Sequence, residues 1–433
     1  MTDRSRRRPR PFSPLREHLR DTLWFAPTTG LLGAVLLWWA ASALDHEIVV
    51  SLRDAGAYAE LRDLVGITED AKAVVTTISS AMMTFVGVVF SISLVAVQMA
   101  SGQLTPRVVR IFVRSRISKL TLTVFLATFL FSLLVLTSYE SETDPRRITS
   151  VPLIQSLLTM ALVALSLLLF IAYVSSTLRL MQVGPLVDRI AWESVRALAR
   201  QPVGDAEPVA LGPENGRVPH RGRAGVLRDV HVAALVRAAR RHGVVLRLIP
   251  RIGDFIVSGA PVLAVHDGAA KPRVPGYAVS VGTERTFHQD FAFGLRQLSD
   301  IALRALSPAV NDPTTATQCL DRIVQLLSAV VREPLGTVRH RDRGGAVRLV
   351  QSVPTWADLV DLALTEIRVA AATSPQVSRR LMAAINDLLT LVPEERAEPL
   401  LRHRALLVQS VVRAVPDAAE REFALVPDRQ GIG

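Results

Sequence analysis

The chain has 433 residues but a single cysteine, Cys319, which excludes an internal disulfide. Because Cys319 lies in an amphipathic stretch, we expect it in packed core rather than as a nucleophile. The histidines, among them His231, His242, His266 and His288, lack the paired spacing of metal ligands. A Walker loop, a GxSxG elbow and a GxGxxG turn are also missing. The sequence therefore gives no positive support for an enzyme, a metal site or a cofactor.

Charged residues are nearly missing from four long apolar runs, in a chain that is 49% hydrophobic. The runs cover residues 23–44, 74–100, 120–139 and 153–180, and only Arg179, near the end of the last run, is charged. Each run reaches the ~20 residues that a helix needs to cross about 30 Å of hydrocarbon. The first run lacks a convincing signal-peptide cleavage site, so we expect it to stay in the membrane. The sequence thus predicts four transmembrane helices.

Basic and acidic residues divide between the segments that flank these runs, within a net charge of +11. Residues 1–22 form a tail rich in arginine, and residues 45–73, expected as a loop, have seven acidic residues against three basic ones. The loop after the second run has no acid and five basic residues: Arg107, Arg110, Arg114, Arg116 and Lys119. The positive-inside rule then predicts that both termini lie in the cytoplasm. We expect the arginines to contact anionic lipid headgroups, and no nucleic acid.

The region after the fourth run divides by composition. We expect the membrane domain to cover residues 23–200, because the fourth helix continues an apolar pattern beyond the bilayer, and residues 201–223 to be a linker rich in Pro, Gly and charge. We expect residues 224–285 to form a small α/β module and residues 286–415 to form a helical domain. Residues 416–433 are expected to be a loose tail. The predicted fold class is therefore a membrane α-helical protein with a cytoplasmic α+β domain.

Within the module, the pattern predicts a helix at 230–241 and strands at 244–249, 254–257 and 261–265. The segment GDFIVSGAPVLAV looks like half of the barrel-sandwich motif that carries lipoyl or biotinyl groups. It lacks a lysine at the turn, so we expect it to pack or assemble subunits and not to carry a group. In the helical domain we expect a basic loop at 339–343 and helices at about 291–306, from Pro313 onward, and at 355–372, 375–391 and 394–415.

The second apolar run carries a stripe of small and polar residues. Its members recur at steps of three and four with one apolar gap: Thr77, Ser80, Thr84, Gly87, Ser91 and Gln98, with Leu94 and Val95 in the gap. Two interpretations stay open. Small residues allow helices to pack closely in lipid. Alternatively, the hydroxyls line a pore that Leu94 and Val95 narrow. No charge lies on the stripe, which disfavours a proton relay.

Two further clusters each have a structural and a functional interpretation. The five basic residues after the second run set topology, or they form the cytoplasmic mouth of a pore or a headgroup contact. The second cluster contains Asp300, Arg304, Asn311 and Asp312. Asp300 and Arg304 have the spacing of a helical salt bridge, and Asp312 before Pro313 suits a helix start. We favour a structural corner between two helices, with a ligand-sensing or gating corner as the alternative.

Long segments of the sequence resemble one known family. They are LWFAPTTGLL, FVGVVFSISLVAVQMASGQLTPRVVRIF, TVFLATFLFSLLVL, RTFHQDFAFGLRQLSDIALRALSPAVNDPTTA and PTWADLVDLALTEIR. By these segments the chain resembles the bacterial predicted membrane proteins grouped as domain of unknown function 2254. The resemblance covers nearly the whole chain, and it implies a four-helix membrane protein of the bacterial inner membrane with its activity left open.

Taken together, the pattern favours an oligomeric channel or channel-like protein for small ions. One four-helix subunit encloses little space, so a path lined by one stripe requires several copies of the chain around an axis. The cytoplasmic domain is then expected to hold the homo-oligomer together. The alternative is a membrane-anchored sensor or scaffold without transport, in which the stripe serves packing alone.

Overall fold

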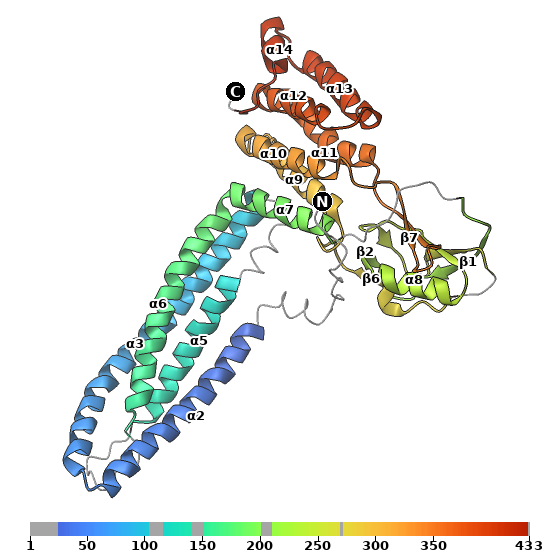
Figure 1. Cartoon of the computed structure of the whole chain (residues 1–433). Coiled ribbons are helices and arrows are strands. Elements are labelled where there is room, and N and C mark those ends of the chain that lie inside the picture. The colour runs from blue at the N-terminus through green and yellow to red at the C-terminus, as the bar shows by residue number, and fades with distance from the viewer. Residues whose placement is uncertain (1–24, 104–115, 140–150, 201–209, 269–271, 432–433) are drawn as a thin grey trace. The chain divides into compact units, whose positions relative to one another are not determined.

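The computed structural model describes residues 25–103, 116–139, 151–200, 210–268 and 272–431. The chain divides into two compact units between Gln182 and Val183. Figure 1 labels the helices of both units, and strands of the second unit where there is room. We call the described residues up to Gln182 the bundle and those from Val183 the C-terminal unit.

The described part of the bundle consists of four long helices. They are α2 (Phe25–Asp54), α3 (Tyr58–Gln103), α5 (Arg116–Thr137) and α6 (Leu153–Met181). By length and composition all four are apolar enough to cross a membrane, with a mean hydropathy between 1.3 and 2.6 over their most apolar windows. The predicted set of four membrane-length helices near the N-terminus is therefore confirmed.

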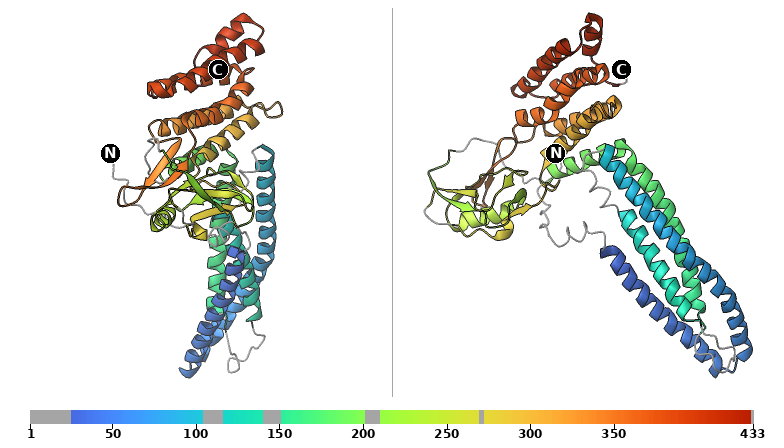
Figure 2. Two further views of the ribbon diagram at one scale, coloured as in Figure 1. Left: turned by 90° about the vertical axis from the view of Figure 1, so that its right-hand side faces the viewer. Right: turned by 180° about the vertical axis from the view of Figure 1, so that it is seen from behind.

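Helix α5 packs against all three other helices of the bundle (Figure 2). Its buried residues recur at steps of three and four, with Phe131 next to Ser132: Thr121, Phe125, Thr128, Phe131, Ser132 and Val135. This spacing turns one face of the helix inward. Since lipid tails are as apolar as leucine side chains, close packing and hydrogen bonds, rather than escape from water, hold such helices together.

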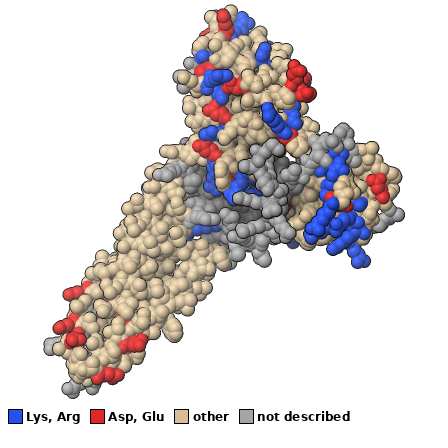
Figure 3. All heavy atoms as spheres, viewed as in Figure 1, with Lys and Arg blue, Asp and Glu red and all other residues tan. Residues whose placement is uncertain are grey.

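The segment 45–73, expected as an acidic loop, is mostly helical, which corrects that prediction. Helix α2 continues to Asp54 and α3 begins at Tyr58, so only three residues join them. Gly56 makes the reversal possible because its φ of 69° lies in the left-handed region. Charge ends an apolar run without ending a helix, since Glu, Lys and Arg are good helix formers. The acidic side chains still gather at this end of the bundle (Figure 3).

The fourth apolar helix does not run unbroken to residue 200, as had been expected. Helix α6 ends at Met181, and a separate helix, α7 (Val183–Leu198), follows Gln182. Pro185 explains the break: it has no N–H for the carbonyl of Met181, and its ring collides with that carbonyl in a regular helix. The membrane-length helix therefore ends before the C-terminal unit begins.

Two sheets form the β part of the C-terminal unit (Figure 2). One has the strand order β1-β5-β3-β8-β7 and the other β4-β2-β6. The first contains β1 (Glu214–Pro219), β3 (Val245–Leu248), β5 (Pro261–His266), β7 (Thr337–Arg341) and β8 (Val347–Ser352). The second contains β2 (Gly225–Val230), β4 (Phe255–Ile256) and β6 (Val279–Gly282). All neighbouring strands are antiparallel except β3 and β8.

The sheet module is larger than its local pattern predicted. Strand β1 lies in the segment expected as a linker, where it pairs with β5. The basic stretch 339–343, expected as a loop, contributes to the hairpin of β7 and β8, in which Arg339 and His340 are buried. Strand β8 then pairs with β3 about a hundred residues earlier in the chain. Local patterns miss this hairpin because arginine and histidine seldom mark a buried strand.

The module's core lies between the sheets and α8 (Val232–Arg241), and includes Leu227, Leu235, Leu246 and Leu263. The remaining described helices are α9 (Phe291–Ala305), α10 (Pro313–Val330), α11 (Trp356–Ala371), α12 (Pro375–Leu389), α13 (Glu398–Ala414) and α14 (Ala418–Leu425), with 3-10 turns η1 (Gly276–Ala278) and η2 (Glu394–Arg396). They pack in succession, α9 on α10 and α11, α12 on α10 and α13. The helices expected at 291–306, from Pro313, and at 355–372 and 375–391 are thus present, and the one at 394–415 is divided into η2 and α13.

The tail after Pro416 is ordered by contacts with α12, and the prediction of a loose end is wrong there. Helix α14 packs against α12. The guanidinium of Arg379 lies 4.2 Å from the centre of the Phe423 ring and donates to the Val426 carbonyl. Asp387 pairs with Arg429 at 2.7 Å. The sequence of the short tail does not reveal these contacts, because they join it to residues of α12 that lie far earlier in the chain.

Candidate functional site

The predicted stripe of α3 lies on the outer surface of the bundle. Its eight members are all exposed: Thr77, Ser80, Thr84, Gly87, Ser91, Leu94, Val95 and Gln98. Leu94 and Val95 are each 51% exposed. The buried residues of α3 lie on the opposite side of the helix: Val75, Ser79, Met82 and Val89. The stripe therefore does not pack against the described helices of the chain.

An aromatic cluster explains why α3 turns this way. Phe85 of α3 packs edge to face on Phe170 of α6, with ring centres 5.9 Å apart, and Phe125 of α5 lies 6.2 Å from Phe85. Tyr173 joins Met82 and Val89 in the same buried cluster. Aromatic rings bury large areas and prefer such tilted contacts. The bulky face of α3 is therefore drawn inward, and the small, polar face is left outside.

The hydroxyl groups of the stripe do not all have hydrogen-bond partners among the described residues. Thr77 donates to the Ala73 carbonyl at 2.9 Å, and Ser80 donates to the Thr76 carbonyl at 3.1 Å. Among the described residues, Thr84 and Ser91 make no side-chain hydrogen bond. A Cβ added at Gly87 would meet no atom within 4 Å. The middle of the stripe thus offers free hydroxyls beside open space.

Hydroxyl groups also occur inside the bundle, where they pair with one another. Ser93 of α3 and Tyr173 of α6 share a hydrogen bond of 2.6 Å, and Thr128 of α5 and Ser166 of α6 share one of 3.1 Å. Sequence patterns alone do not reveal these pairs, because each side chain lies in a strongly apolar run. Buried polar groups need partners, and here they have them. These contacts join α3 and α5 to α6 and hold the face that carries the stripe.

A second polar contact lies between α2 and the start of α6. Asp45, counted from sequence as a loop acid, is buried, and its carboxylate accepts hydrogen bonds from the Ile154 and Gln155 N–H groups at 2.8 and 3.2 Å. An acid at a helix N-terminus satisfies free N–H groups and suits the helix dipole. The side-chain amide of Gln155 is buried and has no hydrogen-bond partner among the described residues. We assign Asp45 a structural role as the cap of α6.

The basic cluster after the second run lies largely outside the described residues. Arg107, Arg110 and Arg114 are not described, and Arg116 begins α5 with its side chain undescribed. Lys119 is half-buried on the first turn of α5. The role of the basic cluster as a pore mouth, headgroup contact or topology signal stays a prediction.

The helix corner in the C-terminal unit has the geometry of a structural turn. Asp312 caps α10 by accepting from the Thr315 N–H at 3.0 Å, and Pro313 follows at the first position, as predicted. Asn311 has a φ of 49°, a left-handed conformation that asparagine tolerates. Asp300 pairs with Arg296 at 2.7 Å, across one helical turn. Asp300, Asn311 and Asp312 thus act in ion pairing, turn and cap, whereas Arg304 is exposed on α9.

The segment RTFHQD joins the sheet module to α9. Arg285 donates two hydrogen bonds to the carboxylate of Asp290 at 2.8 and 2.9 Å, and Asp290 caps α9 through the Phe293 N–H. Burial raises the pKa of Asp290, and the Arg285 guanidinium opposes that rise. The Gln289 amide bonds both the N–H and the carbonyl of Val230, as a neighbouring strand would. This segment is therefore a buried joint and not an open site.

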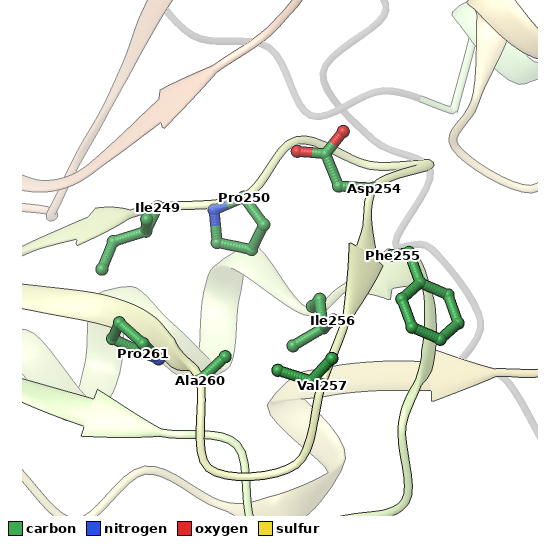
Figure 4. Close-up of a pocket in the computed structure, with 8 residues that line it drawn as sticks. All are labelled: Ile249, Pro250, Asp254, Phe255, Ile256, Val257, Ala260 and Pro261. Atoms are coloured by element: carbon green, nitrogen blue, oxygen red, sulfur yellow. The ribbon is translucent and has the colours of Figure 1, made fainter.

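The C-terminal unit also contains a pocket and a buried cysteine. A pocket of about 460 Å³ beside β4 is lined by Ile249, Pro250, Asp254, Phe255, Ile256, Val257, Ala260 and Pro261 (Figure 4). Its one carboxylate, Asp254, accepts from the Arg251 N–H. Cys319 is buried in core, as expected, and burial raises the pKa of its thiol. Within the described ranges, His, Cys, Asp and Glu form no group of three or more that is placed to hold a metal ion.

The chain is similar to known proteins along most of its length. A protein from Mycobacterium bovis, "Uncharacterized protein Mb1321c", is 29% identical over 95% of this chain and 79% of its own length. "Uncharacterized protein Rv1290c" from Mycobacterium tuberculosis gives the same figures. No solved structure matches significantly. The model of the family described as "Predicted membrane protein (DUF2254)" matches residues 20–387. The chain therefore belongs to the DUF2254 family of predicted membrane proteins.

Proposed function

We propose that this protein is an oligomeric, channel-like membrane protein in which the stripe of α3 faces other copies of the chain and lines a path for small ions. The main observation behind this proposal is that all eight stripe residues are exposed on the bundle of one chain. The four apolar helices and the family relationship support the membrane location on which this proposal rests.

The chemistry of the stripe favours contact with water or with another protein surface over contact with lipid. A hydroxyl without a hydrogen-bond partner in hydrocarbon costs on the order of 1–3 kcal/mol. Thr84 and Ser91 have no such partner among the residues that the structure describes. A water-filled path or a neighbouring copy would supply one. The open space beside Gly87 would let a second backbone approach closely.

The apolar gap near the C-terminal end of the stripe suits a narrow passage. Leu94 and Val95 lie side by side on the same exposed face and would form an apolar constriction where several copies meet. No charged side chain occurs between Val74 and Val95. Such a path would select weakly by charge along its length, and any selectivity would depend on its mouths.

An exposed apolar face on α13 supports assembly through the C-terminal unit as well. Leu401, Ala405, Val408 and Val412 recur at steps of three and four and are all exposed. Leu401 and Val412 are each 48% exposed. Rows of this spacing are typical of helices that pair with another helix. We propose a second copy of the chain as the partner, in line with the assembly role expected of this unit.

The orientation belongs to the same proposal. Acidic residues gather at the α2–α3 turn, whereas the basic cluster lies at the other ends of α3 and α5 in the sequence. By the positive-inside rule the α2–α3 turn faces away from the cytoplasm, and both termini lie within it, in the inner membrane of a bacterium.

Cysteine cross-linking tests the assembly. In membranes that contain the full chain, Ser80→Cys and Ser91→Cys are expected to form disulfide-linked dimers on mild oxidation. The matched controls are Met83→Cys and Phe90→Cys, each at a site that is 63% exposed but lies beside the stripe. Equal cross-linking at stripe and control sites would contradict the proposed interface. The native Cys319 is buried and serves as an unreactive background.

Conductance in planar bilayers tests the path. We expect Ser91→Trp to reduce the current by at least about tenfold, because it fills the path, and Leu94→Ser to increase it by wetting the constriction. Phe90→Trp is the control and should leave the current unchanged. If copies cross-link through the stripe but carry no current, the protein is the sensor or scaffold and not a channel.

A further inference from the structure

The outer side of α8 is a basic surface that the proposed pore does not use. Ala234, Leu235, Ala238 and Ala239 face the core of the sheet module and are buried. The opposite side exposes Ala233, Arg237, Arg240 and Arg241, and the helix contains no acidic residue. Basic side chains gather over this helix in Figure 3. We call Arg237, Arg240 and Arg241, with Arg273, the α8 surface.

Arg273 extends this surface beyond the end of the helix. Its backbone N–H donates to Nε2 of His242 at 3.4 Å, and His242 is the residue that ends α8. Arg273 is exposed. The residues that separate Arg273 from β5 include some outside the described ranges, so the surface is defined by its four arginines alone.

Within the described ranges, these four guanidiniums are not neutralised. Among the described residues none of the four forms an ion pair with a carboxylate, and Arg237 donates only to the Ala233 carbonyl. Elsewhere in the module arginines do have acidic partners: Arg217 and Arg247 pair with Glu214, and Arg348 pairs with Asp342.

The helix dipole accounts for part of this charge. Arg240 and Arg241 lie in the last turn of α8, where cations favour the negative end of a helix. Arg237 lies a turn earlier and Arg273 lies outside the helix, so the dipole does not explain them. A surface of four unpaired arginines without acids favours a ligand that carries several negative charges.

We infer that the α8 surface binds the headgroups of anionic phospholipids. Guanidinium groups match phosphate oxygens in charge and geometry. The same chain carries four helices long enough to cross a bilayer, so the surface stays tethered near lipid. Tethering raises the effective concentration of headgroups, and weak contacts by a few arginines then suffice. This docking would hold the sheet module on the membrane and is independent of whether the bundle conducts ions.

Energy transfer in nanodiscs tests this inference with the full chain. Ala233→Cys places a fluorescent label beside the arginines, while buried Cys319 stays unlabelled. The acceptor is a headgroup-labelled lipid, in discs of phosphatidylcholine alone or of equal parts phosphatidylcholine and phosphatidylglycerol. We expect transfer to be about twofold higher with phosphatidylglycerol and to fall back in high salt.

Charge-matched variants give the control. The triple variant Arg237→Gln, Arg240→Gln, Arg241→Gln should lose the increase with phosphatidylglycerol. The triple variant Arg332→Gln, Arg404→Gln, Arg413→Gln removes the same charge from exposed positions elsewhere and should keep it. Unchanged circular dichroism and elution volume show that both variants fold.

Two results would overturn the inference. Equal transfer in both lipid mixtures, or equal behaviour of the two triple variants, would leave the arginines without a lipid partner. A signal that responds to added polyphosphate or duplex DNA but not to phosphatidylglycerol would assign the surface to a soluble polyanion instead.

Discussion

At the scale of single residues, the clearest electrostatic feature of the C-terminal unit is buried His403. Its Nε2 lies 2.8 Å from a carboxylate oxygen of Asp361, and its Nδ1 is buried without a partner in the part of the chain that the structure describes. Burial lowers the pKa of His403, and the nearby Asp361 only partly offsets that effect. The neutral ring, with Nε2–H donating to Asp361, fits this site because a protonated Nδ1–H would be an unsatisfied buried donor.

This histidine predicts a pH dependence of stability. The folded-state pKa lies below the unfolded value of about 6.5, so the unfolded chain takes up a proton first as the pH falls. His403 therefore contributes stability above about pH 6.5 that is lost progressively below it. We expect the melting temperature of the detergent-solubilised chain to fall between pH 7.5 and pH 5.

The comparison with His403→Gln isolates this contribution. Glutamine keeps a donor toward Asp361 but does not titrate, so the fall in melting temperature should be smaller for the variant than for the native chain. Parallel curves for the two proteins over this range would show that His403 is not the titrating group.

At the scale of elements, a close contact between two helices depends on a glycine. Helices α7 and α9 pack together, and a Cβ added at Gly294 of α9 would lie 1.7 Å from Oγ of Ser194 and 2.7 Å from its Cβ. Ser194 is buried and donates to the Ile190 carbonyl at 2.6 Å. The two backbones therefore approach as closely as they do only because position 294 has no side chain.

Gly294→Ala is expected to destabilise the C-terminal unit. In an isolated helix this change would be favourable by about 1 kcal/mol. The overlap with Ser194 reverses the sign, because overpacking a buried contact costs roughly 1–3 kcal/mol and the serine is held by its own hydrogen bond. Thermal unfolding of the full chain measures the effect.

A second substitution checks that the contact is the cause. Ser194→Gly removes both overlapping atoms, so Gly294→Ala should cost little in a chain that already carries Ser194→Gly. The stability loss of the double variant should therefore be close to that of Ser194→Gly alone. Simple addition of the two losses would mean that the helices do not meet at these residues.

At the scale of the whole molecule, the charge pattern predicts how the chain lies in the membrane. Ala55, in the turn between α2 and α3, and Ser258, in the sheet module, are both exposed. With both termini in the cytoplasm, Ala55→Cys should react with a membrane-impermeant maleimide in cells whose outer barrier is opened. Ser258→Cys should react only after the inner membrane is disrupted.

The reverse pattern would place the C-terminal unit outside the cytoplasm and would contradict the orientation. Reaction of both cysteines before disruption would argue against a stable four-span insertion. The native chain, with Cys319 buried, provides the unlabelled control.

Local features were predictable where nearby residues decide them. The four apolar helices follow from runs of about 20 uncharged residues, and the start of α10 follows from Asp312 and Pro313. The strands around Leu246 and Leu263 follow from alternation between glycines. The break at Pro185 was also readable, since proline ends helices for local reasons, but the continuing apolar pattern obscured it.

Contacts between distant segments decided the rest. The pairing of β8 with β3, and the order that Arg379 and Asp387 impose on the tail, depend on residues far apart in the chain. The direction of the stripe is of the same kind. Its spacing determined that Thr77, Ser80 and Ser91 share a face, because helical geometry is local. Whether that face turns inward or outward was decided only in the tertiary structure, where Phe85 and Met82 pack against α5 and α6 and leave the hydroxyls exposed.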